Sequence, residues 1–231
     1  MPTASAVVPV GYKQTEVGVI PEDWNISKLG DIISYTKGFA FRSNDYRKYG
    51  TRIIQVSDTD ANGIHDNNAV YLDTNNSHMY SKWRLQYGDI VVSTVGSKPP
   101  MYDSLVAKST FIPEKYDGSL LNQNAVILRA KSGMLDQQII LHSIFQSKRY
   151  LTHIEKIYRG NANQASITLT ELFDFLIIMP TDKLEIESVS KALVEFDSKI
   201  QAFEGLIAKK KDIKQGAMQE LLTGKTRLPG Y

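Results

Sequence analysis

The sequence contains no cysteine, and this absence removes several kinds of chemistry at once. A chain without cysteine forms no disulfide, carries no thiolate nucleophile and offers no cysteine ligand to zinc. The histidines His65, His78, His142 and His153 also lack the close spacing, to one another or to a carboxylate cluster, that a metal site requires. We therefore expect no metal site, and we expect the protein to reside in the reducing cytoplasm.

Long apolar runs and a large excess of one charge are also absent. No stretch approaches the ~18 apolar residues of a membrane span, and the N-terminus lacks a basic segment followed by an apolar one. The formal net charge is only +2. We therefore expect no membrane partner, and any surface that binds nucleic acid must be local rather than spread over the whole protein.

Proline is missing between Asp182 and about Thr223, where apolar residues recur at alternating steps of three and four. This spacing predicts one helix with a narrow apolar stripe, capped by Asp182 and ended by Gly224. At ~1.5 Å per residue it would be roughly 60 Å long, more than the preceding domain needs for its own core. The positions predicted to face a partner helix are Ile186, Val189, Leu193, Phe196, Ile200, Phe203, Ile207, Ile213, Ala217 and Leu221.

The charges along this helix predict how it pairs. Between Asp182 and Glu204 there are six acids and three bases, whereas between Gly205 and Tyr231 there are six bases and two acids. An antiparallel pair of identical helices sets the acidic half of one against the basic half of the other, which favours an antiparallel coiled coil. Two alternatives stay open: the helix could fold back on its own domain, or its stripe could hold a different subunit.

The region before the helix has the pattern of a mixed domain. Because its strands do not alternate regularly with long helices, we predict a largely antiparallel α+β fold for residues 18–180, preceded by an N-terminal arm of little structure (1–17) and followed by the spacer helix and tail (181–231). The predicted strands are Arg52 to Ser57, Ala69 to Leu72, Asp89 to Thr94, Leu105 to Ile112, Ala125 to Arg129 and Phe175 to Met179. The predicted helices are Ser77 to Leu85, Leu135 to Gln146, Ser147 to Ile157 and a short one capped by Thr168 and Glu171.

Two segments match catalytic motifs only in part. Residues 223–226 match the end of a phosphate-binding loop, but the first glycine of that motif would fall at Gln219, and the segment follows a helix instead of opening one. Residues 99–102 are similar to the Pro-Pro-aromatic turn of amino-methyltransferases but lack the preceding Asn or Asp. We predict no catalytic residue in this chain.

Four polar loops, at residues 37–48, 93–98, 122–124 and 159–164, have a composition suited to binding nucleic acid. Arginine suits guanine, asparagine and glutamine suit adenine, and lysine grips phosphate. The alternative is that loop amides form turns with their own backbone. The candidate contacts are Lys37, Arg42, Ser43, Tyr46, Arg47, Lys48, Thr94, Ser97, Lys98, Asn122, Gln123, Arg159, Asn161, Asn163 and Gln164.

Several short motifs follow one another in an order that covers nearly the whole chain. Those in the domain are Gly18-Val19-Ile20-Pro21-Glu22-Asp23-Trp24, Leu29-Gly30-Asp31, Gly88-Asp89-Ile90-Val91-Val92-Ser93, Leu121-Asn122-Gln123-Asn124 and Gly160 to Gln164. The stretch from Lys209 to Leu228 is a further motif, in the helical region that follows the domain. In this order they resemble the DNA-specificity subunits of type I restriction–modification enzymes.

The resemblance implies a target-recognition domain and a role without catalysis. Members of that family bind a split DNA target and recruit modification subunits, which methylate adenine at N6 with S-adenosylmethionine, and restriction subunits, which add ATP-driven translocation and cleavage. The partners implied for this chain are therefore double-stranded DNA, a DNA methyltransferase subunit and a restriction/translocase subunit. S-adenosylmethionine and ATP are expected in those subunits, with no cofactor in this chain.

The chain departs from the family in having one recognition domain and one helix, whereas family subunits generally carry two of each. We therefore hypothesise a half-subunit that forms a homodimer through antiparallel helices and recognises a bipartite, inverted-repeat site, with the helix length setting the gap. Two alternatives remain: an anti-restriction decoy or inactive fragment that binds the modification subunit without DNA, and a small DNA methyltransferase.

Overall fold

A four-stranded antiparallel sheet, in the order β11–β9–β13–β4, lies at the centre of the domain in the computed structural model, which describes residues 8–60, 63–98, 106–161 and 164–230. The interior strand β13 (Ala125–Ala130) is buried on both faces, which explains its nearly continuous apolar sequence. Val126 and Leu128 join the larger hydrophobic cluster on one face, and Ala125 and Ile127 join a second cluster on the other. The other strands of this sheet are β4 (Ile33–Lys37), β9 (Ile90–Ser93) and β11 (Ser109–Phe111).

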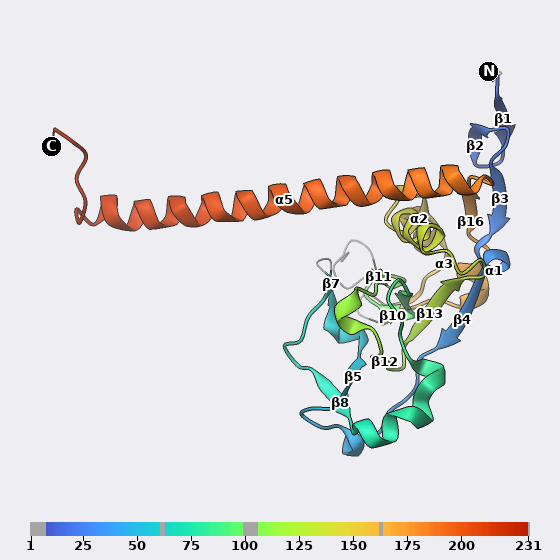
Figure 1. Ribbon diagram of the computed structural model, residues 1–231, viewed down its shortest axis with the longest axis horizontal. Coiled ribbons are helices and arrows are strands. Elements are labelled where there is room, and N and C mark those ends of the chain that lie inside the picture. Colours follow the sequence, from blue (N-terminus) through green and yellow to red (C-terminus); the bar gives the residue numbers. More distant parts are fainter. Residues whose placement is uncertain (1–7, 61–62, 99–105, 162–163, 231) are drawn as a thin grey trace.

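Smaller sheets extend the domain around this centre (Figure 1). β12 runs parallel to β5, and β8 pairs with β5 on its other side in the antiparallel sense. β15 lies between β10 and β14, while β16 pairs with β3, β1 with β2 and β6 with β7. These strands are β1 (Tyr12–Thr15), β2 (Gly18–Pro21), β3 (Asn25–Lys28), β5 (Thr51–Ile54), β6 (Thr59–Asp60), β7 (Gly63–Ile64), β8 (Val70–Leu72), β10 (Val95–Gly96), β12 (Leu120–Leu121), β14 (Arg159–Asn161), β15 (Gln164–Ser166) and β16 (Leu176–Met179).

Short helices cover the larger hydrophobic cluster. Ser147 caps one of them by accepting a hydrogen bond from the Tyr150 amide. Thr168 accepts one from the Glu171 amide, as the capping pattern there predicted. The helices of the domain are α1 (Leu29–Ile32), α2 (Leu135–Phe145), α3 (Lys148–Ile157) and α4 (Leu169–Phe173), with 3-10 turns η1 (Ser43–Asp45), η2 (Val56–Asp58), η3 (Thr74–Trp83) and η5 (Glu114–Tyr116). The helix predicted from Ser77 is thus a 3-10 segment, broken by the non-helical backbone of Tyr80.

The long helix α5 (Lys183–Leu222) contains 40 residues and is capped by Asp182, whose carboxylate accepts from the Glu185 amide at 2.9 Å. Its first turns pack against α2, and beyond them it leaves the domain and runs into solvent (Figure 1). The Nε1 of Trp24 donates to Glu185 at 3.0 Å and ties the first turn to the domain. The prediction of a mixed, largely antiparallel fold with a long terminal helix is confirmed, and the helix does not fold back along its length.

Three positions of the predicted stripe have a different role from the one expected. Ile186 is buried, and Val189 and Leu193 are partly buried, all against the larger cluster of their own domain. They therefore anchor α5 to its domain and are not available to a second helix. The positions from Phe196 onward are exposed, so the free stripe begins there.

The segment predicted as an arm of little structure also contains a strand. β1 pairs with β2 in antiparallel register, with Tyr12 opposite Pro21 and Thr15 opposite Gly18. Gly18 itself has φ +115°, a conformation that favours glycine at the turn between the two strands. The hairpin therefore joins the end of the predicted arm to the start of the predicted domain.

Candidate nucleic-acid interface

Three of the four predicted polar loops meet at one end of the central sheet. β10 pairs with β15, so that Val95 lies opposite Ser166, and Ser166 in turn lies opposite Arg159 of β14. The amide of Thr94 donates to the carbonyl of Asn124 at 2.8 Å. Residues 93–98, 122–124, 159–161 and 164–166, distant in sequence, therefore form one continuous surface.

The fourth loop, residues 37–48, runs beside the second of these segments. The amides of Gly38 and Phe39 donate to the carbonyls of Ala125 and Leu121 at 2.9 and 3.0 Å. A Cβ atom at Gly38 would lie 1.8 Å from the Asn122 carbonyl oxygen, so only glycine allows this close approach. The loop base is further held by an aromatic contact, because the rings of Phe39 and Trp83 meet at a tilted angle with centroids 4.4 Å apart.

Several predicted contacts are presented to solvent on this framework. Arg42 and Lys48 stand on the firmly held loop, and within the described part of the chain their side chains make no hydrogen bond or ion pair, so both charges are available to an anion. The predicted contacts that are exposed and whose side chains make neither a hydrogen bond nor an ion pair among the described residues are Lys37, Arg42, Ser43, Lys48, Gln123 and Gln164.

Three other predicted contacts are occupied in holding the loops together. The amide groups of Gln55 and Asn122 both donate to the hydroxyl of Tyr46 at 3.3 Å. Asn122 is only 7% exposed, and its Oδ1 accepts from the Gln123 amide. Arg47 donates to two backbone carbonyls of its own loop at 3.0 Å. We therefore assign Tyr46, Asn122 and Arg47 to loop support and leave them out of the proposed contacts.

Arg159 is exposed but already paired. Its guanidinium lies 2.6 Å from the carboxylate of Glu171. Hydrogen bonds from the Thr168 hydroxyl and then from Arg159 hold the pKa of Glu171 below its usual value. Arg159 must therefore exchange this carboxylate for phosphate or base before it can contact nucleic acid.

The remaining predicted contacts are less accessible or lie outside the described part. Thr94 and Lys98 are half-buried, and Ser97 is buried. The backbone of Asn161 pairs with Gln164 in the β14–β15 hairpin, whereas its side chain and the whole of Asn163 lie outside the described residues.

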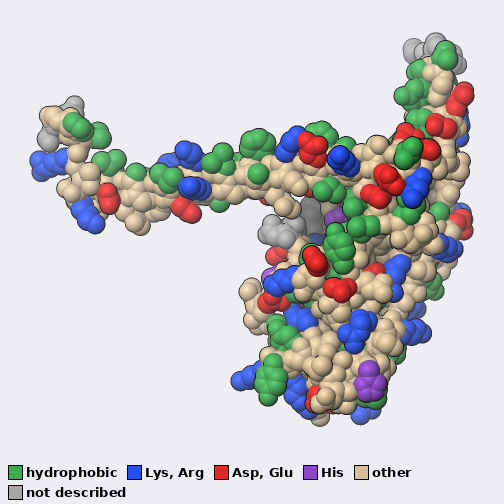
Figure 2. Space-filling view, viewed as in Figure 1, with side chains coloured by type: hydrophobic (Ala, Val, Ile, Leu, Met, Phe, Trp, Pro, Cys, Tyr) green, Lys and Arg blue, Asp and Glu red, His purple; other side chains and the backbone are tan. Residues whose placement is uncertain are grey.

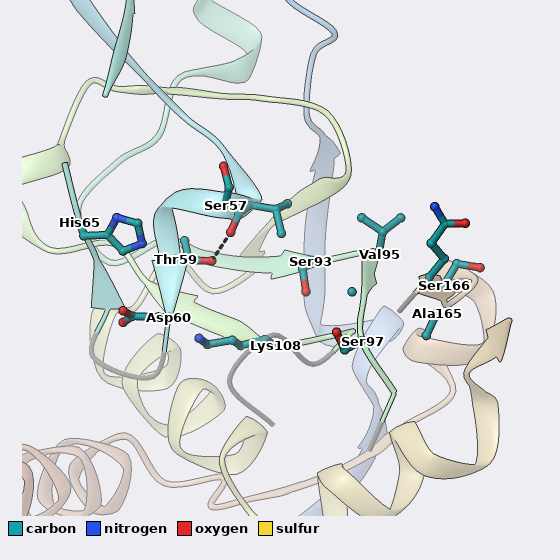
Figure 3. Close-up of a pocket in the computed structure, with 13 residues that line it drawn as sticks. Ser57, Thr59, Asp60, His65, Ser93, Val95, Ser97, Lys108, Ala165 and Ser166 are labelled. Atoms are coloured by element: carbon teal, nitrogen blue, oxygen red, sulfur yellow. Dashed lines mark hydrogen bonds between the residues drawn. The ribbon is translucent and has the colours of Figure 1, made fainter. Parts of the chain in front are cut away.

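A cavity of about 810 Å³ adjoins the surface formed by β10 and β15. Ser57, Thr59 and His65 line one side, and Lys108 points across it toward Asp60 (Figure 3). The Nδ1 of His65 is buried and has no hydrogen-bond partner among the described residues. The sequence offered no signal for this cavity, because only the fold brings Ser57, Thr59 and His65 opposite Lys108 and the strands β10 and β15. Hydroxyl, imidazole and ammonium groups in one hollow can donate to phosphate oxygens or base edges.

Among the described residues, no group of three or more His, Cys, Asp or Glu side chains is placed to hold a metal ion. Likewise, no helix in the described ranges is both long and apolar enough to cross a bilayer.

A mixed domain that presents polar loops and projects a long helix with an apolar stripe defines a recognition and assembly module. Residues 21–211 match the model of the type I restriction modification DNA specificity domain. This match covers most of the chain, both the domain and much of α5, and the chain belongs to that family. The family predicted from the order of motifs is thereby confirmed.

Similar proteins agree with this assignment. The chain is 26% identical over 214 residues to a putative type I restriction enzyme MjaX specificity subunit of Methanocaldococcus jannaschii, covering 92% of this chain and 48% of that protein. It is 23% identical to the MjaVIII specificity subunit of the same organism, covering 94% and 49%. The chain thus spans about half the length of these relatives.

Solved structures show the same fold. The HsdS subunit from Thermoanaerobacter tengcongensis matches with a TM-score of 0.57 at 14% identity, over 91% of this chain and 47% of that one. A chain from a structural study of complex assembly and conformational transition of the type I R-M system matches with a TM-score of 0.55 at 15% identity, over 87% of this chain and 46% of that one.

Proposed function

We propose that this chain is a non-catalytic specificity component of a type I restriction–modification system that reads one half of a bipartite DNA site. The observation that supports this most is the family match, which includes the domain with its polar loops and most of α5 together. Partner subunits would then carry the catalysis: a modification subunit with S-adenosylmethionine and a restriction/translocase subunit with ATP. This chain would determine which DNA sequence the complex binds, and the system would act in the cytoplasm.

We further propose that two copies pair through the free part of α5. From Phe196 onward the apolar side chains of the stripe are exposed, and Figure 2 shows hydrophobic side chains recurring along the projecting helix. A stripe of this kind in water favours association with another apolar surface. Acids dominate the half of α5 near the domain and bases the far half, which favours the antiparallel arrangement.

The length of the free helix sets the separation of the two readers in this arrangement. Residues 194–222 span roughly 43 Å at about 1.5 Å per residue. One turn of B-DNA is about 34–36 Å, so two readers related by a twofold axis would contact half-sites about one turn apart. An inverted repeat with a fixed gap is the DNA that fits such a dimer.

Replacing Arg42 with alanine is expected to weaken binding to the cognate site by roughly 10- to 100-fold, because a good arginine–base pair contributes about 1–3 kcal/mol of discrimination. Binding to random duplex should weaken less. The measurement is a titration of labelled duplexes at fixed salt with the chain assembled with its modification subunit.

Lys13→Ala is the matched control for this experiment. It removes one positive charge from the β1–β2 hairpin, which lies at the other end of the domain from the loop that carries Arg42 (Figure 1). It should leave both affinities unchanged. Equal losses on cognate and random DNA for Arg42→Ala would demote Arg42 to a phosphate contact, and no DNA binding by the wild-type assembly would favour the decoy.

A further inference from the structure

A groove of about 600 Å³ opens where α5 leaves its domain. One wall is α5 itself, through Asp197, Ile200, Gln201 and Glu204. The opposite wall is formed by the domain, through residues that include Phe111, His142, Gln146 and Leu151. The face of α5 that anchors Ile186, Val189 and Leu193 to the domain therefore continues, without a break, as the wall of this groove.

The position of the groove decides what reaches it when two helices pair. A second α5 lying antiparallel on the free stripe runs with its Leu222 end toward the domain. The domain already covers the stripe as far as Leu193, so the second helix must stop there. Its post-helix segment (residues 223–230) then arrives at the groove.

We propose that this groove is the docking site for the post-helix segment of a second copy of the chain. This inference rests on the proposed homodimer and adds a second interface to it. The segment cannot fill the groove of its own chain, because it lies at the far end of α5 (Figure 1). Between Glu204 and Thr223 alone the helix extends by roughly 28 Å, at about 1.5 Å per residue.

The charges of the groove and of the post-helix segment are complementary. Asp197 and Glu204 carry two negative charges into the groove and have no ion-pair partner among the described residues. The post-helix segment carries Lys225 and Arg227, both exposed. Lys108 also lines the groove, at its domain side. Burial lowers the pKa of His142 to about 4, against the opposing effect of Asp197, so this ring is neutral at pH 7 and adds no positive charge.

Shape and apolar surface support it as well. Phe111 and Ile200 offer apolar surface to the groove, and Leu228, 60% exposed in the single chain, can cover it. The direction in which the segment leaves α5 is also fixed. Gly224 ends the helix with φ +69°, and the Thr226 hydroxyl donates to Glu220 of the last turns at 3.2 Å. A short, basic, preformed segment thus faces an acidic groove of the partner.

The absence of native cysteine allows a direct test by disulfide cross-linking. Thr226→Cys is placed on one tagged chain, and Gln201→Cys or Gln146→Cys, on opposite walls of the groove, is placed on an untagged chain. After mixing and mild oxidation we expect a covalent tagged–untagged species with at least one groove position and none from any variant alone. Lys82→Cys, on η3 outside the groove, is the matched control and should give none.

The oligomeric state, measured on the same samples by sedimentation, separates the two proposals. A dimer that cross-links as expected supports both. A dimer that fails to cross-link at either wall, or that cross-links equally well with the control, overturns the docking of the segment and leaves the helix pair intact. A monomer at micromolar concentration overturns both.

A second experiment tests the charges. Changing Lys225 and Arg227 together to glutamate should weaken the dimer by about 10-fold, and Asp197→Lys with Glu204→Lys in the same chain should restore much of the loss. Unchanged dimer affinity in the first variant would contradict the docking proposal.

Discussion

Arg52→Ala is expected to lower the free energy of unfolding by roughly 3–5 kcal/mol, the range for breaking a buried ion pair. Arg52 and Asp58 are 8% and 1% exposed, and their charged atoms lie 2.8 Å apart. Removing the guanidinium leaves the Asp58 carboxylate buried without its counter-charge, although the Gln55 amide still donates to it at 3.0 Å. Urea denaturation of both proteins measures the change.

The same substitution should also disturb η2, because Asp58 belongs to it and η2 leads into the cavity beside the candidate interface. Lys28→Ala breaks an exposed pair with Asp174 and is the matched control, with no measurable change expected. The double variant Arg52→Met with Asp58→Leu should recover part of the loss, because no charge is then left buried. A loss for Arg52→Ala as small as that of the control would contradict this account.

Introducing aspartate at both Ile200 and Phe203 is expected to convert the proposed dimer into a monomer and to raise its dissociation constant by at least about 100-fold, or ~2.7 kcal/mol. Both side chains are exposed in the single chain, at 54% and 65%, so the fold should be unaffected. In the helix pair each carboxylate would be buried against an apolar side chain without a partner. Sedimentation over a range of concentrations measures the constant.

The matched control for this variant adds the same two charges to the other side of the helix. Ser198 and Ala202 lie one turn apart, turned well away from the stripe. Aspartate at both should change the dissociation constant by no more than a few-fold. If the stripe variant dimerises as well as this control does, α5 is not the dimer interface.

The long helix could be predicted from sequence because its signals are local. Its cap at Asp182, its apolar spacing and its end near Gly224 all lie within the helix or beside it. The sequence could not predict at which residue α5 leaves the surface of its own domain. Val189 and Ile200 have the same periodicity, but one packs on its own domain and the other is exposed, because the outcome depends on residues far away in the chain.

The candidate interface was predictable in its segments but not in its individual contacts. Composition alone predicts the loops at 93–98 and 159–164, and the fold places their strands β10, β14 and β15 in one sheet. Gln123 is exposed whereas its neighbour Asn122 is buried, although both are amides in the same loop. The cavity residue His65 was missed because other residues that line the same cavity, such as Ser97 and Lys108, lie far along the chain, and long-range packing has no local signature.

The central claim is that two copies of this chain, held antiparallel by α5, place two identical readers on one DNA. Mapping the adenines methylated after the full chain is assembled with its modification subunit tests it most directly. We predict methylated adenines in the two halves of an inverted repeat with one fixed separation. Methylation of single, unrepeated sites, or of half-sites at variable separations, would contradict the claim.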